Sequence, residues 1–164
     1  MTSWDLIHYT GQQTINAKGI DTAMHYYTAL AEEIRANAAH LLAEDVGPGD
    51  MTAQLIPDSQ WARAHVITRE PAVLCGVAWV DEIFRRLDGR IVLDWQAADG
   101  DSLDADQAFL TLEGPARSLL TGERAALNVL QTLSSTATAT RHYVDLLPGT
   151  QARLLDTRKT LPNM

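Results

Sequence analysis

Cysteine and lysine are both scarce in this chain of 164 residues, and each scarcity limits what the protein can be. Cys75 is the only cysteine, so no disulfide can form within the chain and nothing indicates an oxidising compartment. It lies in the apolar run of residues 72–76, which favours a buried small side chain over a nucleophile. No apolar run reaches the roughly 18 residues of a membrane span, and the N-terminus lacks a signal-peptide pattern. We therefore expect a cytoplasmic protein that contacts no membrane.

Positive charge is also in short supply. Lys and Arg number 13 against 21 Asp and Glu, which gives a formal net charge of −8. Nucleic-acid-binding proteins usually present a basic face, so nucleic acid is not an expected partner. The sequence has no glycine-rich phosphate loop and no Ser/His/Asp triad, and its five histidines lack metal-ligand spacing. With 46% hydrophobic residues, the chain has the composition of an ordinary globular protein.

The spacing of apolar residues predicts an α+β fold. Residues 1–20 have no clear period and are interpreted as a poorly ordered extension, after which Asp21 is the expected N-cap of the first helix. Helices are predicted over residues 21–44, 78–87 and 117–133, with a second helical stretch continuing to Leu147. Strands are predicted over residues 63–69, 73–75, 91–95, 108–112 and 152–155.

This order of elements indicates two units. Residues 21–134 are predicted to form an N-terminal α+β domain, and residues 135–164 to begin a second unit. The strand over residues 152–155 has no obvious partner and would need further elements to cover it. We therefore expect the chain to be incomplete.

One face of the long predicted helix is polar. At spacings of three or four residues it carries Arg117, Thr121, Arg124, Asn128 and Gln131, and no carboxylate. A solvated face explains this pattern most simply. The functional alternative is a row of donors that faces an anion, because the fork of an arginine can bind a carboxylate or phosphate at two points.

A second polar group, Asp156-Thr157-Arg158-Lys159-Thr160, follows the last predicted strand. Adjacent cations at the C-terminal end of a strand can bind two different anions, and ligands bind at that end in α/β folds. A solvated loop is the alternative. Lys159 is the only lysine outside the N-terminal extension, which favours the functional interpretation.

Taken in order across residues 30–162, these segments resemble the quinolinate phosphoribosyltransferase family, the decarboxylating nicotinate-nucleotide pyrophosphorylases of NAD synthesis. The segments that carry the resemblance are Glu44-Asp45-Val46-Gly47 with Gly49-Asp50-Met51-Thr52; Ile67-Thr68-Arg69-Glu70 with Gly76; Asp99-Gly100-Asp101; Gly114-Pro115-Ala116-Arg117-Ser118-Leu119-Leu120-Thr121-Gly122-Glu123-Arg124-Ala125-Ala126-Leu127-Asn128; and Leu155-Asp156-Thr157-Arg158-Lys159-Thr160. The last two are long and specific.

The resemblance implies an open-faced α/β sandwich domain followed by a β/α barrel, of which residues 135–164 would be the truncated start. It also implies a homodimer or larger homo-oligomer, in which the N-terminal domain of one subunit covers the barrel mouth of its neighbour. Arg124 would then reach the neighbour's quinolinate, whereas Thr157, Arg158 and Lys159 would line the barrel's own site. Arg158 is assigned to a quinolinate carboxylate, and Lys159 to quinolinate or phosphoribosyl pyrophosphate.

The implied reaction transfers a phosphoribosyl group from phosphoribosyl pyrophosphate to quinolinate, with loss of carbon dioxide, to give nicotinate mononucleotide. Mg²⁺ is the expected companion of the pyrophosphate, with no ligands for it in this chain. Because most of the barrel would be missing, the 164-residue chain alone is expected to be inactive. The sequence departs from the family at Ser134-Ser135, where Ser-Gly is usual, and at Pro162-Asn163, where Pro-Gly is usual.

Two alternatives stay open. One is a molybdenum-transport-associated relative of the same family, which would share these motifs. A lipoyl- or biotinyl-like carrier, or another non-catalytic interaction module, would fit the hairpin expected over residues 95–114. A carrier needs a lysine at its hairpin tip, however, and none lies between Lys18 and Lys159.

Overall fold

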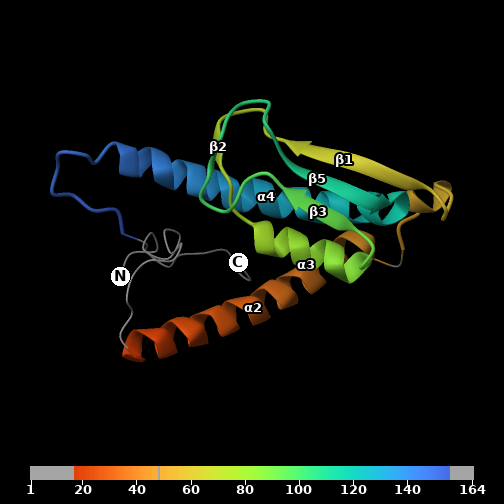
Figure 1. Cartoon of the computed structure of the whole chain (residues 1–164), viewed down its shortest axis with the longest axis horizontal. Helices are drawn as coiled ribbons and strands as arrows, with labels where there is room; N and C mark the ends of the chain where they lie inside the picture. Colours follow the sequence, from red (N-terminus) through yellow and green to blue (C-terminus); the bar gives the residue numbers. More distant parts are fainter. Residues whose placement is uncertain (1–16, 48, 156–164) are drawn as a thin grey trace.

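The computed structural model describes residues 17–47 and 49–155, with side chains from Leu30 onward. A sheet lies on one side of two packed helices, α3 and α4, and a third helix, α2, lies on their other side (Figure 1). The elements are α2 (Ala17–Val46), the short 3-10 helix η1 (Ala53–Leu55), β1 (Trp61–Ile67), β2 (Ala72–Val73), α3 (Val77–Leu87), β3 (Val92–Trp95), β4 (Ser102–Leu103), β5 (Ala108–Pro115) and α4 (Ala116–Asp145). The predicted α+β class is confirmed.

The main sheet is antiparallel and has the order β1-β5-β3, while β2 and β4 form a separate pair. Because side chains alternate along a strand, Leu110 and Leu112 of β5 point to one face and are buried there. Thr111 and Glu113 point to the other face, where Glu113 pairs with Arg63 at 2.7 Å. The outer face is thus exposed to solvent and the inner face meets the helices, as in an open-faced sandwich. Since β5 is the central strand, residues 95–114 are part of this domain and not a separate carrier hairpin.

The close crossing of α3 and α4 depends on a glycine. A Cβ atom at Gly122 would lie 2.5 Å from Cε1 of Phe84 and 2.7 Å from Cδ1 of Leu87. No real carbon pair is that close, so any side chain here would push the two helices apart. Around this crossing lies a core built from both helices and the inner face of the sheet: Leu74, Val80, Phe84, Leu103, Phe109, Leu110, Leu112, Leu119, Ala126 and Leu130.

Helix α2 begins at Ala17, so the last four residues of the predicted poorly ordered extension over residues 1–20 are helical. Asp21 lies inside the helix and does not cap it. Ala17 and Lys18 are good helix formers, and the glycine that follows them is tolerated in a first turn. Residues 1–16 lie outside the described part of the chain.

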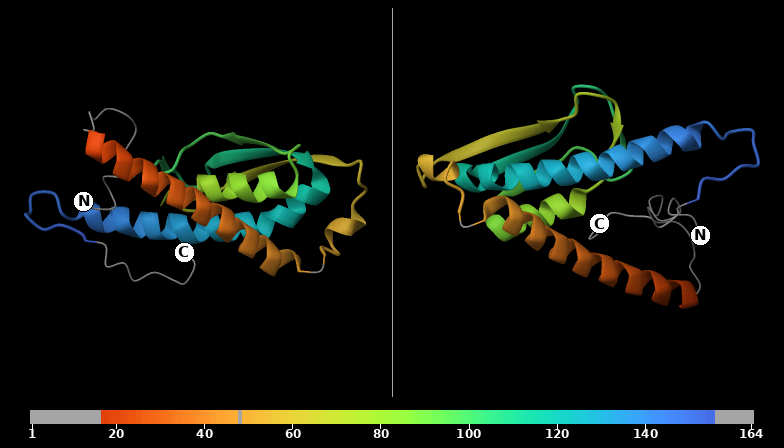
Figure 2. Two further views of the ribbon diagram at one scale, coloured as in Figure 1. Left: turned by 90° about the horizontal axis from the view of Figure 1, so that it is seen from below. Right: turned by 180° about the vertical axis from the view of Figure 1, so that it is seen from behind.

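The C-terminal half of α2 packs against α3 and α4. Ala38 is fully buried in a small cluster with Ile83, Ala125 and Val129. The helix ends at Val46, and Gly47 takes the left-handed conformation, with a φ of +51°, that commonly closes a helix. The outer ends of α2 and α4 diverge (Figure 2). The two long helices therefore pack together where the C-terminal half of α2 meets the N-terminal half of α4.

Helix α4 is one continuous helix, whereas the sequence predicted two stretches. No proline or glycine interrupts it between Gly122 and Pro148. Two side chains in its second half contact the backbone at and after β2. Thr138 Oγ1 accepts a hydrogen bond from the amide of Val73 at 2.8 Å, and Ser134 Oγ accepts one from the amide of Cys75 at 3.0 Å. The domain boundary predicted after residue 134 falls inside this helix, and the division into two domains stays a prediction.

The strand predicted over residues 152–155 is wrong, since these residues form no strand. Leu155 is 70% exposed and no described strand lies beside the segment, so nothing supplies the hydrogen bonds that a strand needs. In the part of the chain that the structure describes, no helix is both long and apolar enough to cross a membrane.

Candidate functional site

The polar face of α4 meets a segment of the chain that runs beside it in the opposite direction. This segment, residues 45–58, connects the end of α2 to β1 and contains three aspartates that contact α4. Each aspartate meets one member of the polar face predicted from the sequence: Arg117 pairs with Asp58, Thr121 with Asp50, and Arg124 with Asp45. The face therefore has carboxylate partners, but they come from another part of the chain.

Two of these contacts fasten the segment to the helix. Arg117 pairs with Asp58 and also donates from Nε to the carbonyl of Ile56. Asp50 accepts a hydrogen bond from Thr121 Oγ1 at 2.8 Å and another from the amide of Ala53 at 2.9 Å. The amide of Ala53 and the hydroxyl of Thr121 hold the pKa of the Asp50 carboxyl below its usual value. The donors of Arg117 and Thr121 are thus occupied within the chain.

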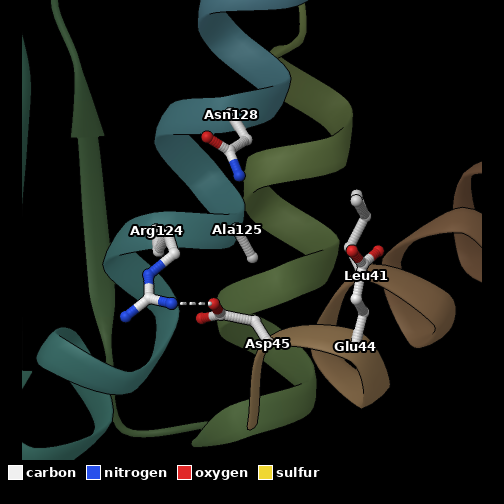
Figure 3. Close-up of a pocket in the computed structure, with 6 residues that line it drawn as sticks. All are labelled: Leu41, Glu44, Asp45, Arg124, Ala125 and Asn128. Atoms are coloured by element: carbon white, nitrogen blue, oxygen red, sulfur yellow. Dashed lines mark ion pairs between the residues drawn. The ribbon is translucent and has the colours of Figure 1, made fainter.

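Arg124 is placed differently. Its Nη1 atom forms an ion pair with Asp45 Oδ1 at 3.0 Å, yet 76% of its side chain is exposed, against 17% for Asp45 (Figure 3). The pair lies at a pocket of about 240 Å³ between the end of α2 and the third and fourth turns of α4. The residues that line this pocket are Leu41, Glu44, Asp45, Arg124, Ala125 and Asn128. Among the three paired members of the polar face, Arg124 is the one directed to solvent.

The charges in the pocket limit what it can bind by itself. Arg124 brings one positive charge, while Glu44 and Asp45 bring two negative ones. A dicarboxylate placed in the pocket would meet more repulsion than attraction. Arg124 is therefore suited to reach outward, toward an anion whose other charges are met by cations outside this pocket.

The remaining predicted residues divide into two groups. Asn128 lines the pocket with Arg124, whereas Gln131 is exposed and does not line it. Thr157, Arg158 and Lys159 lie outside the described residues, so the structure does not test whether they meet Arg124. Asp45, Asp50 and Asp58 were not predicted from the sequence as partners of α4. Their signal was the clustering of acidic residues and glycines directly after a helix.

The described residues contain neither an activated cysteine nor a metal centre. Burial, helped by the nearby Asp99 carboxylate, raises the pKa of the Cys75 thiol to about 11, which agrees with the predicted inert side chain. Within residues 17–47 and 49–155, no three His, Cys, Asp or Glu side chains lie together in a group that could hold a metal ion.

Comparison with known proteins gives one consistent result. The family model described as "Quinolinate phosphoribosyl transferase, N-terminal domain" matches residues 50–134. The nicotinate-nucleotide pyrophosphorylase (carboxylating) of Mycobacterium leprae is 40% identical over 129 residues, which are 75% of this chain and 45% of that protein. The quinolinate phosphoribosyltransferase (decarboxylating) 1 of Nicotiana glauca is 34% identical over 75% of this chain and 35% of its own length.

A solved structure agrees with these sequence matches. The nicotinate-nucleotide pyrophosphorylase of Francisella tularensis superimposes with a TM-score of 0.78 at 40% identity, over 81% of this chain and 48% of that one. The chain thus spans less than half the length of these three proteins.

Proposed function

The chain belongs to the quinolinate phosphoribosyl transferase family through its N-terminal domain, and we propose that the whole protein makes nicotinate mononucleotide. The substrates would be quinolinate and phosphoribosyl pyrophosphate, and the other products pyrophosphate and carbon dioxide. The observation that carries this proposal furthest into the site is Arg124, an exposed guanidinium held at the edge of a pocket in a domain of this family.

The chemistry asks for the positioning of anions more than for acid–base groups. The pyridine nitrogen attacks C1 of the ribose as pyrophosphate leaves with the electron pair of the broken C–O bond. The positively charged ring then accepts the electrons of the bond to the C2 carboxylate, which departs as carbon dioxide, and a proton takes its place. A cation that holds a quinolinate carboxylate would orient the nitrogen toward the ribose, which is a large part of catalysis in such a reaction.

Arg124 supplies one such cation but not a whole site, because its own pocket carries an excess of negative charge. We infer that Arg124 acts in a homodimer or larger homo-oligomer, on quinolinate bound mainly by a neighbouring subunit. Thr157, Arg158 and Lys159 are the proposed partners in that site. Mg²⁺ is proposed to accompany the pyrophosphate. The described residues offer no cluster to hold the metal, so no step is assigned to it.

A first experiment tests the reaction. A protein that continues this chain to the full length of its relatives (the longer protein) is incubated with quinolinate, phosphoribosyl pyrophosphate and Mg²⁺, and the release of carbon dioxide and pyrophosphate is measured. We expect equal amounts of both with quinolinate and none with pyridine-3-carboxylate, which has no carboxylate at C2. The 164-residue chain assayed alone is expected to show no turnover, because it spans under half the length of its relatives.

A second experiment tests the sharing of the site between subunits. Arg124→Ala and Lys159→Ala subunits are each expected to be nearly inactive alone. After random subunit exchange, half of the dimers carry both kinds of subunit, and each of these has one intact site, so about a quarter of wild-type activity should return. No recovery, with exchange verified by mass spectrometry, would show that Arg124 acts within its own subunit.

A further inference from the structure

Three other arginines of this domain bind a carboxylate through the same two atoms of the guanidinium, Nε and Nη2. Arg63, Arg85 and Arg90 each donate from Nε and Nη2 to one carboxylate, at distances of 2.7–3.2 Å. This edge presents two parallel N–H groups, which is the geometry that a carboxylate fits best. An arginine that is to receive a carboxylate from a ligand therefore needs the Nε–Nη2 edge free.

Arg124 leaves that edge free. Its ion pair with Asp45 uses Nη1, which lies 3.0 Å from Asp45 Oδ1. Neither its Nε nor its Nη2 atom donates a hydrogen bond to any of residues 30–47 and 49–155. In Figure 3 one terminal nitrogen faces Asp45 and the other points away from it. Asp45 thus contacts the guanidinium at a nitrogen that is not part of the Nε–Nη2 edge, and leaves that edge open to a two-point contact.

Asp45 is also the fixed member of the pair. Its side chain is 17% exposed and lies in the last turn of α2, a helix held by the buried Ala38. The Arg124 side chain is 76% exposed and has nothing but this contact to fix its end among the described residues. An arginine already held in its binding geometry loses less conformational freedom when a ligand arrives.

The simpler explanation is that the pair fastens α2 to α4. Ion pairs with one highly exposed partner contribute little to folding stability, however. The same two helices already share the buried contact of Ala38 with Ala125 and Val129. Loss of the pair should therefore leave the melting temperature almost unchanged, and this separates the two explanations.

We propose that Asp45 is a positioning residue, which holds Arg124 through Nη1 so that its Nε–Nη2 edge faces a carboxylate of the bound pyridine dicarboxylate. This rests on the function proposed above, because that function supplies the dicarboxylate. Asp45 makes no contact with the ligand in this account. It acts through Arg124 alone.

The charge of Asp45 makes the test a sharp one. Removing a negative charge near an anion site should by itself strengthen the binding of a dianion. Asp45→Asn in the longer protein is expected to do the reverse and raise the KM for quinolinate about tenfold, because the guanidinium is released. The KM for phosphoribosyl pyrophosphate should stay within about twofold. Glu123→Gln is the matched control: it removes an exposed carboxylate one residue from Arg124, outside the pocket, and should not raise the KM for quinolinate.

Arg124→Lys shows whether Asp45 acts through the fork. Lysine has no Nε–Nη2 edge, so Asp45→Asn should have no further effect on the KM for quinolinate in the Arg124→Lys protein. An unchanged or lowered KM in Asp45→Asn would overturn the proposal. An equal rise in both backgrounds would overturn it too, since Asp45 would then act on something other than Arg124.

A separate readout keeps this inference distinct from the reaction. If the wild-type protein shows no turnover of quinolinate, the proposed function fails, and nitrogen NMR of the arginine side chains still decides the positioning. Held by Asp45, Arg124 should give separate Nη1 and Nη2 signals that merge in Asp45→Asn, with Arg124→Lys used to assign them. Merged signals already in the wild-type protein would overturn the proposal whatever the activity.

Discussion

The Asp50 carboxylate accepts a hydrogen bond from the hydroxyl of Thr121 at 2.8 Å, across 71 residues of sequence. Its other oxygen accepts from the amide of Ala53, which begins η1, at 2.9 Å. One side chain thus joins the turn after α2 to the helix that carries Arg124. The place of Arg124 in space depends on contacts of this kind between the segment over residues 45–58 and α4.

Thr121→Val tests this contact. It keeps the shape of the side chain but removes the donor, so the melting temperature should fall by roughly 2–4 °C. Asp50→Ala should lower the melting temperature less in the Thr121→Val protein than in the wild type, because only the bond to the Ala53 amide is then left to lose. Thr136→Val is the control, since the hydroxyl of Thr136 bonds only the carbonyl of Thr132 in its own helix. Circular dichroism measures the melting temperatures of the wild type, the two single variants, the double variant and the Thr136→Val control. Fully additive effects of Thr121→Val and Asp50→Ala would show that the two side chains do not share a hydrogen bond.

The contacts of Asp88 predict how the stability of the folded protein depends on pH. The Arg90 guanidinium, at 2.9 and 2.7 Å, is the first of the donors that hold the pKa of the Asp88 carboxyl well below its ordinary value of 3.8. The folded state therefore binds the proton less readily than the unfolded state. The stabilisation is complete above the unfolded-state pKa and is lost as the pH falls through the lower folded-state pKa.

Asp88→Asn should accordingly be less stable than wild type at about pH 7, and the difference should shrink as the pH falls below about 4. Urea unfolding across this range measures the change in midpoint. A constant difference between the two proteins would show that Asp88 does not titrate in the way its contacts require.

The sequence predicted the elements around the site better than the contacts that form it. Residues 117–133 show a clear helical period, and the structure has a helix there. The same pattern could not show that Arg117, Thr121 and Arg124 each meet an aspartate, because these partners lie 59–79 residues away and their pairing depends on how α2 packs. The donor row was therefore interpreted without its carboxylates, and Arg124 could not be separated from its neighbours.

Two predictions near the C-terminal end of the described chain were wrong because they depend on contacts with other elements. Serine and threonine are frequent over residues 132–140 and are weak helix formers, yet α4 continues because Ser134 and Thr138 bond the backbone near β2. The segment Ala152-Arg153-Leu154-Leu155 was interpreted as a strand. A strand needs a neighbour, however, and none is present among the described residues. Both errors concern tertiary partners and not propensity.

The close contacts around Gly122 predict that a single added methyl group would destabilise the α3–α4 crossing. Alanine favours a helix more than glycine does, but its Cβ atom would lie 2.5 Å from the ring of the buried Phe84. We expect Gly122→Ala to lower the free energy of unfolding by roughly 1–3 kcal/mol. Gly89→Ala is the matched control, because nothing lies within 4 Å of its Cβ position. Urea unfolding compares the two, and equal stabilities would contradict the close crossing.

Cys75 predicts slow thiol chemistry. A pKa of about 11 leaves the thiol almost fully protonated at neutral pH, and the thiolate is the reactive form. Iodoacetamide should therefore modify Cys75 at least ten times more slowly in the folded protein than in urea. Mass spectrometry follows the labelling, and equal rates in both conditions would show that the thiol is neither buried nor shifted.

The account depends most on Arg124, and the affinity of its variants for quinolinate tests it most directly. Arg124→Ala in the longer protein should raise the KM for quinolinate roughly 10- to 100-fold, with the KM for phosphoribosyl pyrophosphate nearly unchanged, because a hydrogen-bonded charge pair with one carboxylate is lost. Arg124→Lys should recover part of this loss, since the charge remains but the two-point contact does not. A wild-type KM for quinolinate in Arg124→Ala would contradict the assignment of this arginine to the substrate.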